Sequence, residues 1–269
     1  MKENREFEIT LIIEGDKVET IFEQISSLKT FGSFHLSDVN TQTIYDIYFD
    51  TASDQLKEMG FGLRLRYLNN KKFVTLKGKS RKSTWGGVER VELEYPWNQK
   101  GWDKIYRYLN DEIPDLHLQS GLVMEKDAEN FIKKAGLRKI QERKNIRQSK
   151  FVYAAKPFTC SNLLAELALD SVTLFVGQET FFMYEIEIES KNNGKPADIK
   201  EMADLLQVKF GAFIRVYHHS KLTTGKIITL IYTSPEFQGT LKNKNQLAFD
   251  SYRLIEDFYD IQKLNGANK

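Results

Sequence analysis

The sequence has a single cysteine, Cys160, and no long hydrophobic run. One cysteine excludes an internal disulfide and any zinc site that is built from several cysteines. A membrane-spanning helix needs about 20 consecutive apolar residues, and the longest candidate, residues 227–232, is far shorter. The first residues also lack the apolar core of a secretory signal peptide. These absences predict a soluble, cytoplasmic protein without a membrane partner.

The chain also lacks a large excess of either charge. It has 39 Lys and Arg residues and 37 Asp and Glu residues, which gives a net charge of +2. Proteins that bind nucleic acid through a basic surface are usually more positive, so no nucleic-acid partner is expected. The complete glycine-rich loop of P-loop NTPases is also absent. With 269 residues, of which 41% are hydrophobic and 28% are charged, the chain is long enough to bury a sizeable core.

Polar and apolar residues alternate over many segments, which is the pattern of half-buried β-strands. Strands are expected at 6–13, 43–49, 62–68, 72–77, 87–95, 138–153, 163–174 and 180–190. Apolar residues with helical spacing predict helices at 17–29, 99–110, 123–134, 197–209, from about 221 onward and at 247–264, with a polar linker at 234–245. This order predicts an α+β fold in which antiparallel strands form a barrel and the last helices are appended to it.

The polar faces of these strands carry charges of one sign more often than solvated strands do. Residues two or four positions apart share one face of a strand, and the sets are Glu6 and Glu8; Arg64 and Arg66; Thr75, Lys77 and Lys79; Arg90, Glu92 and Glu94; Arg143, Asn145 and Arg147; Glu166 and Asp170; and Glu185, Glu187 and Glu189. For any one strand, a solvated outer face is the ordinary interpretation. Across seven strands, repelling like charges favour ligands of opposite charge.

Two kinds of ligand match these faces. Paired carboxylates suit a hard divalent cation, which prefers oxygen ligands, whereas arginine and lysine side chains suit phosphate groups. Acidic and basic strands in one barrel therefore predict a metal–polyphosphate complex in a charged interior. The amphipathic helices would then cover the apolar outer faces of the strands.

Eight short motifs occur in an order that resembles the CYTH superfamily, the triphosphate tunnel metalloenzymes. They are Glu6-x-Glu8, Asp-Ile-Tyr-Phe-Asp-Thr at 46–51, Leu-Arg-Leu-Arg at 63–66, Thr-Leu-Lys-Gly at 75–78, Arg90-x-Glu92-x-Glu94, Leu169-Asp170, Glu185-x-Glu187-x-Glu189 and Ser220-Lys221. The resemblance covers about residues 5–225. It implies an eight-stranded antiparallel β-barrel that binds a triphosphate and divalent metals. Together with the helical pattern after residue 220, it predicts a tunnel barrel domain at 1–225 and a C-terminal helical extension at 226–269.

The resemblance implies a role for individual residues. The metal, Mg²⁺ or Mn²⁺, would be bound by the acidic residues Glu6, Glu8, Asp170, Glu185 and Glu187. The phosphates would be bound by the basic residues Arg64, Arg66, Lys77, Arg90, Arg143, Arg147 and Lys221. The residues expected to act directly in catalysis are Glu6, Glu8, Lys77 and Arg143. The reaction would be an in-line attack on the triphosphate by a metal-oriented water.

One departure from the family pattern keeps alternatives open. Family members typically have Glu-x-Glu-x-Lys in the first strand, and this chain has Thr10 in place of the lysine. The leading interpretation is a hydrolase of inorganic triphosphate or of an organic or nucleoside triphosphate. The alternatives are an adenylate cyclase of class IV and a polyphosphate- or nucleotide-binding module with little turnover. The partner in each case is a small molecule that contains a triphosphate, and the oligomeric state stays open, with a dimer among the options.

Overall fold

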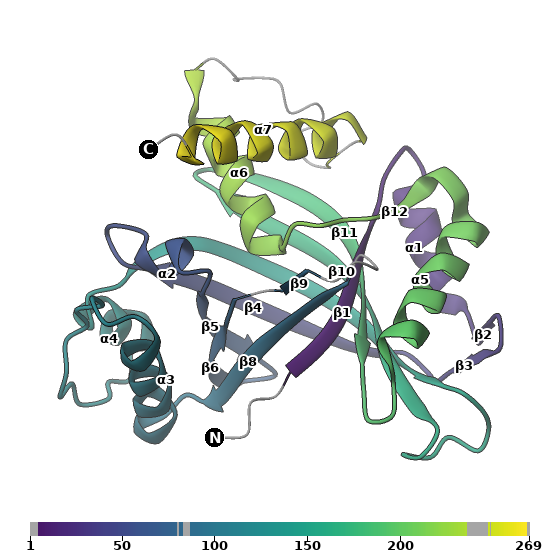
Figure 1. Cartoon of the computed structure of the whole chain (residues 1–269), viewed down its shortest axis with the longest axis horizontal. Helices are drawn as coiled ribbons and strands as arrows, with labels where there is room; N and C mark the ends of the chain where they lie inside the picture. Colours follow the sequence, from purple (N-terminus) through teal and green to yellow (C-terminus); the bar gives the residue numbers. More distant parts are fainter. Residues whose placement is uncertain (1–4, 80, 83–86, 236–246, 248, 268–269) are drawn as a thin grey trace. The chain divides into compact units, whose positions relative to one another are not determined.

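The computed structural model describes residues 5–79, 81–82, 87–235, 247 and 249–267 (Figure 1). The chain forms two compact units. The first contains the described residues up to Glu8 together with Gln42–Asn145, and the second contains Ile9–Thr41 and the described residues from Ile146 onward. Most of the predicted linker at 234–245 falls outside the described residues.

The first unit is mainly a set of antiparallel strands with two covering helices. Its elements are the start of β1 (Arg5–Ile13), most of β4 (Asn40–Asp50), α2 (Gln55–Glu58), β5 (Gly62–Leu68), β6 (Lys71–Lys77), β7 (Arg81–Lys82), β8 (Val88–Pro96), α3 (Gln99–Glu112), α4 (Ala128–Lys134) and the first half of β9 (Arg138–Tyr153). Leu63 and Leu65 of β5 are fully buried in one cluster with Trp102 of α3 and Phe131 of α4. The helices therefore cover the apolar face of these strands, as the sequence predicts, and leave the charged residues on the opposite face.

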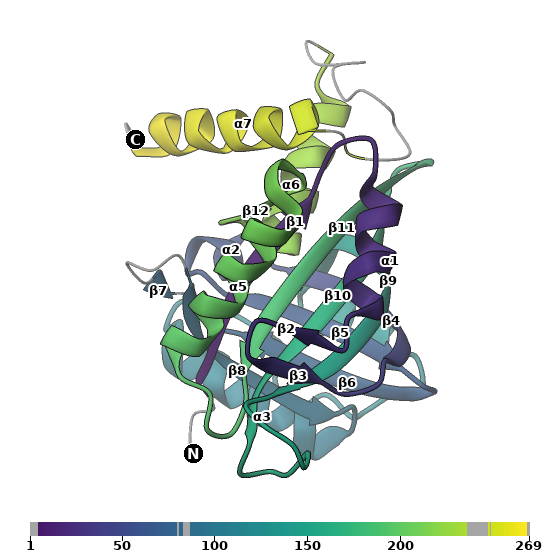
Figure 2. The ribbon, with the colours of Figure 1, turned by 90° about the vertical axis from the view of Figure 1, so that its right-hand side faces the viewer.

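The second unit combines two long strands with most of the helices. Its elements are the end of β1, α1 (Val18–Ser27), β2 (Thr30–Phe31), β3 (Phe34–Leu36), the end of β9, β10 (Leu163–Val176), β11 (Glu179–Ser190), α5 (Pro196–Phe210), a 3₁₀ turn (Gly211–Phe213), β12 (Ile214–Val216), α6 (Lys221–Thr233) and α7 (Phe249–Ala267). Val172 of β10 and Met183 of β11 pack in one apolar cluster with Ile228 of α6 and Tyr252 of α7. Figures 1 and 2 both show α6 and α7 side by side.

The strands pair in the order β10-β11-β1-β8-β6-β5-β4-β9, and β9 also pairs with β10. These eight strands thus form an antiparallel ring of hydrogen-bonded neighbours, and the expected α+β fold with an eight-stranded closed sheet is confirmed. The bounds of β5 and β9 match the predicted strands exactly. The short elements β2, β3, β7, β12 and α2 were not predicted, because two to four residues are too few to show a period.

Candidate functional site

An arginine cluster forms in the first unit on the charged face of three strands. It consists of Asp46 and Tyr48 on β4, Arg64 and Arg66 on β5, and Arg143 on β9. Antiparallel pairing places Asp46 opposite Arg66 and Tyr48 opposite Arg64. The register of the next strand follows from the turn Asn69-Asn70, since both residues have positive φ angles, as a tight hairpin requires.

Asp46 is the common partner of all three arginines. Arg66 donates two hydrogen bonds to its carboxylate, from Nε at 2.8 Å and from Nη2 at 2.9 Å. Nη1 of Arg64 lies 3.5 Å and Nη2 of Arg143 lies 3.3 Å from Asp46 Oδ2. The phenol oxygen of Tyr48 also accepts from Arg64, at 3.2 Å, and from Arg143, at 2.5 Å.

The three guanidinium groups control the ionisation of their neighbours. Burial alone would raise the pKa of Asp46, but Arg64 and Arg66 together with Arg143 hold this pKa well below its usual range. Burial would likewise raise the pKa of Tyr48, and Arg143 and Arg64 lower it instead. The cluster therefore groups three guanidinium groups around one carboxylate that is ionised at neutral pH.

Arg143 has donor groups that the cluster does not use. Its side chain is 5% exposed, and its Nε and Nη1 atoms are buried without a hydrogen-bond partner among the described residues. Its guanidinium lies over the ring of Tyr48, with its central carbon 4.7 Å from the ring centroid. Since buried donors are nearly always hydrogen-bonded in folded proteins, these nitrogens are available for an anionic ligand.

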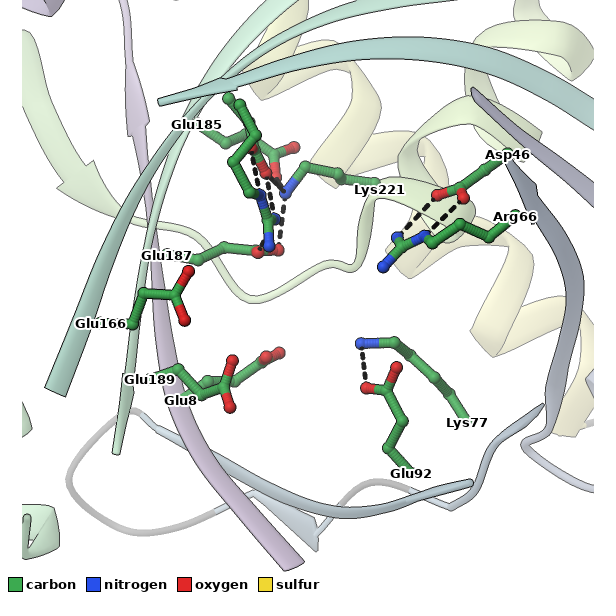
Figure 3. A network of polar contacts seen from close by, with 12 residues as sticks. Glu8, Asp46, Arg66, Lys77, Glu92, Glu166, Glu185, Glu187, Glu189 and Lys221 are labelled. Carbon is green, nitrogen blue, oxygen red and sulfur yellow. Dashed lines mark hydrogen bonds and ion pairs between the residues drawn. The ribbon is translucent and has the colours of Figure 1, made fainter. Parts of the chain in front are cut away.

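A second row of charges lies beside the arginine cluster, on strands β6, β8 and β1. Glu92 accepts from Arg64 Nη2 at 3.1 Å and pairs with Lys77 Nζ at 2.6 Å (Figure 3). Glu8 pairs with Arg90, whose Nη2 lies 2.6 Å from its Oε1. Glu6 lies in β1, but its side chain falls outside the described part of the structure. The predicted residues Lys77 and Arg90 thus each contact a carboxylate of their own unit.

A carboxylate cluster forms in the second unit. It consists of Asp170 on β10, Glu185 and Glu187 on β11, Arg147 on β9 and Lys221 at the first position of α6. The turn between β10 and β11 contains Gly177 with a positive φ of 61°, a conformation that glycine adopts without strain. The resulting register places Asp170 directly opposite Glu185.

One ammonium group is shared by three carboxylates in this cluster (Figure 3). Lys221 Nζ lies 2.6 Å from Glu187, 2.7 Å from Glu185 and 3.0 Å from Asp170. Arg147 donates two hydrogen bonds to Asp170, at 2.7 and 2.6 Å, and one to Glu187 at 2.5 Å. Lys221 is placed there by the start of its helix, because the Ser220 hydroxyl caps α6 by accepting from the Thr223 backbone at 3.2 Å.

The pKa values of this cluster follow from burial and from unequal sharing of the cations. Burial lowers the pKa of Lys221, but the three carboxylates outweigh it and raise this pKa above its ordinary value, so the ammonium stays charged. For Asp170, burial is outweighed by Arg147 and Lys221, which lower its pKa. For Glu185, burial outweighs the attraction of Lys221 and raises its pKa. With two cations against three carboxylates, the cluster has a surplus of oxygen ligands.

The carboxylate cluster fits a divalent cation by the chemistry of its donors, because Mg²⁺ and Mn²⁺ prefer carboxylate oxygens. Within the described ranges, however, no three Asp, Glu, His or Cys side chains are arranged to hold a metal ion. Lys221 and Arg147 contact the oxygens that such an ion would use. The structure thus provides suitable ligand atoms, which cationic side chains neutralise.

The structure groups the residues predicted from the sequence into two sets. Arg64, Arg66 and Arg143 come together in the first unit, whereas Arg147 and Lys221 join the acidic residues of the second. Sequence reasoning missed Asp46 and Tyr48 as site residues. The available signal was their position two apart in the Asp-Ile-Tyr-Phe-Asp-Thr motif, on the face that pairs with Arg66 and Arg64.

Comparison with known proteins gives the family. The model of the CYTH domain matches residues 6–211. The chain belongs to the CYTH family. Members of the CYTH family are mostly triphosphatases and are generally dependent on a divalent metal. No curated protein matches the chain.

Two solved structures are similar to the chain, and the first of them shares its fold. HpAC1 from Hippeastrum, a proposed adenylyl cyclase with a dominant triphosphatase activity, is 20% identical, with a TM-score of 0.55 over 82% of this chain and 95% of that chain. A proposed adenylate cyclase from Bacillus halodurans is 19% identical, with a TM-score of 0.45 over 81% of this chain and 96% of that one. In the described part of the CYTH chain, none of the helices is both long and apolar enough to span a membrane.

Proposed function

We propose that this CYTH protein is a divalent-metal-dependent hydrolase of inorganic triphosphate or of an organic or nucleoside triphosphate. The observation that carries the proposal is the unused donor capacity of Arg143 within the arginine cluster. A buried guanidinium with two unpartnered nitrogens suits the closely spaced, multiply charged oxygens of a polyphosphate. Family membership supports the reaction type.

The arginine cluster would act by binding and orienting phosphate groups. Asp46 fixes the side-chain directions of Arg64, Arg66 and Arg143, so little conformational entropy is lost when they bind an anion. Because the guanidinium groups are in place before the ligand arrives, they stabilise charge that develops on the phosphate oxygens without reorganising. Lys77 would contribute a further positive charge beside them.

The acidic residues would hold the metal. We propose the ligands that the family resemblance implies, namely Glu6, Glu8, Asp170, Glu185 and Glu187. A bound Mg²⁺ or Mn²⁺ would neutralise phosphate charge and orient the attacking water. Within the carboxylate cluster, Lys221 and Arg147 would hold the side chains of Asp170 and Glu187 in fixed positions, and both cations lower the pKa of Asp170.

The proposal is tested with the purified protein in Mn²⁺ or Mg²⁺. Inorganic triphosphate, ATP and thiamine triphosphate are supplied in turn, and phosphate, pyrophosphate and cyclic AMP are measured. Phosphate release supports the hydrolase. Pyrophosphate with cyclic AMP would identify a cyclase instead, and tight binding without any product would identify a binding module.

Two arginine variants link the activity to the arginine cluster. Arg143→Met should lose about tenfold or more in kcat/KM, since each charge-assisted hydrogen bond contributes about 1.5–3 kcal/mol. Arg138→Met, an exposed arginine on the same strand with 52% of its side chain exposed, should keep the wild-type rate. Equal rates in both variants would refute the role of Arg143.

A further inference from the structure

Lys221 lies at the end of a segment that the C-terminal helix α7 contacts repeatedly. β12 leads through residues 217–220 directly into α6, where Lys221 is the first residue. Neither α6 nor α7 falls within residues 6–211 that match the CYTH model. The segment that carries Lys221 and the helix α7 that contacts it both lie beyond the residues that the CYTH model matches.

The sheet face that carries the carboxylate cluster changes from charged to apolar residues along β10 and β11. On β10, Asp170 is followed on the same face by Val172 and Leu174, and on β11, Glu185 is preceded by Met183. These apolar residues pack in one cluster against α6 and α7. The two helices thus cover the apolar continuation of the face, and Lys221 lies where the face becomes charged.

Helix α7 also contacts three residues of the segment that leads to Lys221, namely Arg215, Tyr217 and His219. Arg215 of β12 forms two hydrogen bonds to Glu256 of α7, at 2.8 and 2.9 Å. The ring centroid of Tyr259 lies 4.4 Å from that of His219, two residues before Lys221. The rings of Tyr252 and Tyr217 meet edge to face at 5.5 Å. These contacts come from successive turns of one helix.

We propose that α7 is the positioning element for Lys221, and that Glu256 and Tyr259 are positioning residues that act through it. An ammonium shared by three carboxylates at 2.6–3.0 Å requires a fixed backbone beneath it. Arg215 of β12, joined to Glu14 at 2.7 Å as well as to Glu256, connects α7 to β12 and to the residue that follows β1. Loss of a contact to α7 frees the 217–220 segment, and Lys221 leaves its place among the carboxylates.

The main test uses Glu256→Gln, with Asp257→Asn as the matched control, because Asp257 is the next residue of the same helix and is exposed. The ammonium of Lys221 is observed by NMR in protein with ¹⁵N-labelled lysine, and its signal is assigned by its absence in Lys221→Met. In the wild type, the signal should persist because the ammonium is buried and exchanges its protons slowly. It should broaden or disappear in Glu256→Gln and stay unchanged in Asp257→Asn.

The second measurement is a double-mutant cycle on triphosphate hydrolysis, and this part alone rests on the proposed function. A misplacement of about 1 Å can cost about 100-fold in rate, so Glu256→Gln is expected to lower kcat/KM by roughly tenfold. In the Lys221→Met background it should lower kcat/KM no further, because its effect passes through Lys221. If Glu256→Gln lowers kcat/KM by the same factor in the wild type and in Lys221→Met, the positioning role is refuted.

A further variant and a fallback separate the possible failures. Tyr259→Ala removes the ring against His219 and should give the same NMR change as Glu256→Gln. If wild-type protein hydrolyses no triphosphate, the proposed function fails, and the NMR comparison still decides the inference. An unchanged Lys221 signal in both folded variants would overturn it.

Discussion

The two charged clusters have opposite compositions. In the first unit, one carboxylate, Asp46, is contacted by three guanidinium groups. In the second, one ammonium, Lys221, is contacted by three carboxylates. Each central group holds the side chains of opposite charge around it in place. The net charge of +2 is therefore the sum of two regions of opposite charge, one rich in guanidinium groups and one rich in carboxylates.

The largest expected effect comes from removing the centre of the arginine cluster. Asp46→Asn leaves three buried guanidinium groups without their shared counter-charge, and the free energy of unfolding should fall by about 3–5 kcal/mol. Urea denaturation measures the loss. The control Asp54→Asn breaks an exposed pair with Arg138 and should cost about 1 kcal/mol or less. A loss no greater than that of the control would contradict the central role of Asp46.

The corresponding change in the second unit is Lys221→Met. It removes the ammonium that contacts Asp170, Glu185 and Glu187, and stability should fall by about 3 kcal/mol. Millimolar Mn²⁺ should restore part of this loss and should raise the melting temperature of Lys221→Met more than that of the wild type. The matched control is Lys200→Met, which removes an exposed lysine paired with Asp204. Equal Mn²⁺ effects in all three proteins would show that these oxygens do not take a cation.

Ligand binding tests whether the three guanidinium groups of the first unit are specific for polyphosphate. Arg66→Ala should weaken triphosphate binding by roughly tenfold or more, because charge-assisted hydrogen bonds contribute about 1.5–3 kcal/mol each. Binding of monophosphate should change much less, since it makes fewer contacts. Calorimetric titration of both ligands into the wild type, Arg66→Ala and Arg138→Ala gives the comparison. The same loss for both ligands would make Arg66 a structural residue only.

The smallest effect concerns the pH dependence of stability. Asp46 and Asp170 have lowered pKa values, so their contribution is complete above about pH 4 and is lost as the pH falls below it. Glu14 lies outside both clusters, and burial raises its pKa despite Arg215, so it opposes folding increasingly as the pH rises above about 4. The free energy of unfolding of Glu14→Gln minus that of the wild type should therefore be larger at pH 7 than at pH 4.

Urea denaturation at the two pH values measures this difference. Glu201→Gln, on the exposed side of α5, is the matched control and is measured at the same two pH values. A pH dependence no larger for Glu14→Gln than for this control would show that Glu14 ionises as an ordinary exposed carboxyl does.

Much of the fold could be predicted because the strands are long and alternate regularly. Residues 138–153 show this pattern over 16 positions, and the strand has these bounds. The pairing of particular residues could not be predicted in the same way, since it depends on the register between strands that are far apart in sequence. Asp46 meets Arg143 across 97 positions, and no local pattern indicates that contact.

The two arginines on β9 show a further limit of sequence reasoning. Arg143 and Arg147 lie four residues apart on one face, and the same role in phosphate binding was predicted for both. In the structure, Arg143 contacts Asp46 and Arg147 contacts Asp170 and Glu187. Asp46 lies on β4 and Asp170 on β10, and β9 pairs with both of these strands.

The pairing of β1 with β12 has a consequence for how the protein is made. Leu11 of β1 pairs with Val216 of β12, whereas Arg5 pairs with Val91 of β8. At roughly 5–20 residues per second, the ribosome needs about 10–40 s to synthesise the roughly 200 residues between Leu11 and its partner. For the part of that time that follows the synthesis of β8, one half of β1 has its β8 partner and the other half lacks β12. The nascent chain therefore exposes a strand edge with unpaired backbone N–H and C=O groups, and we expect a chaperone to bind there.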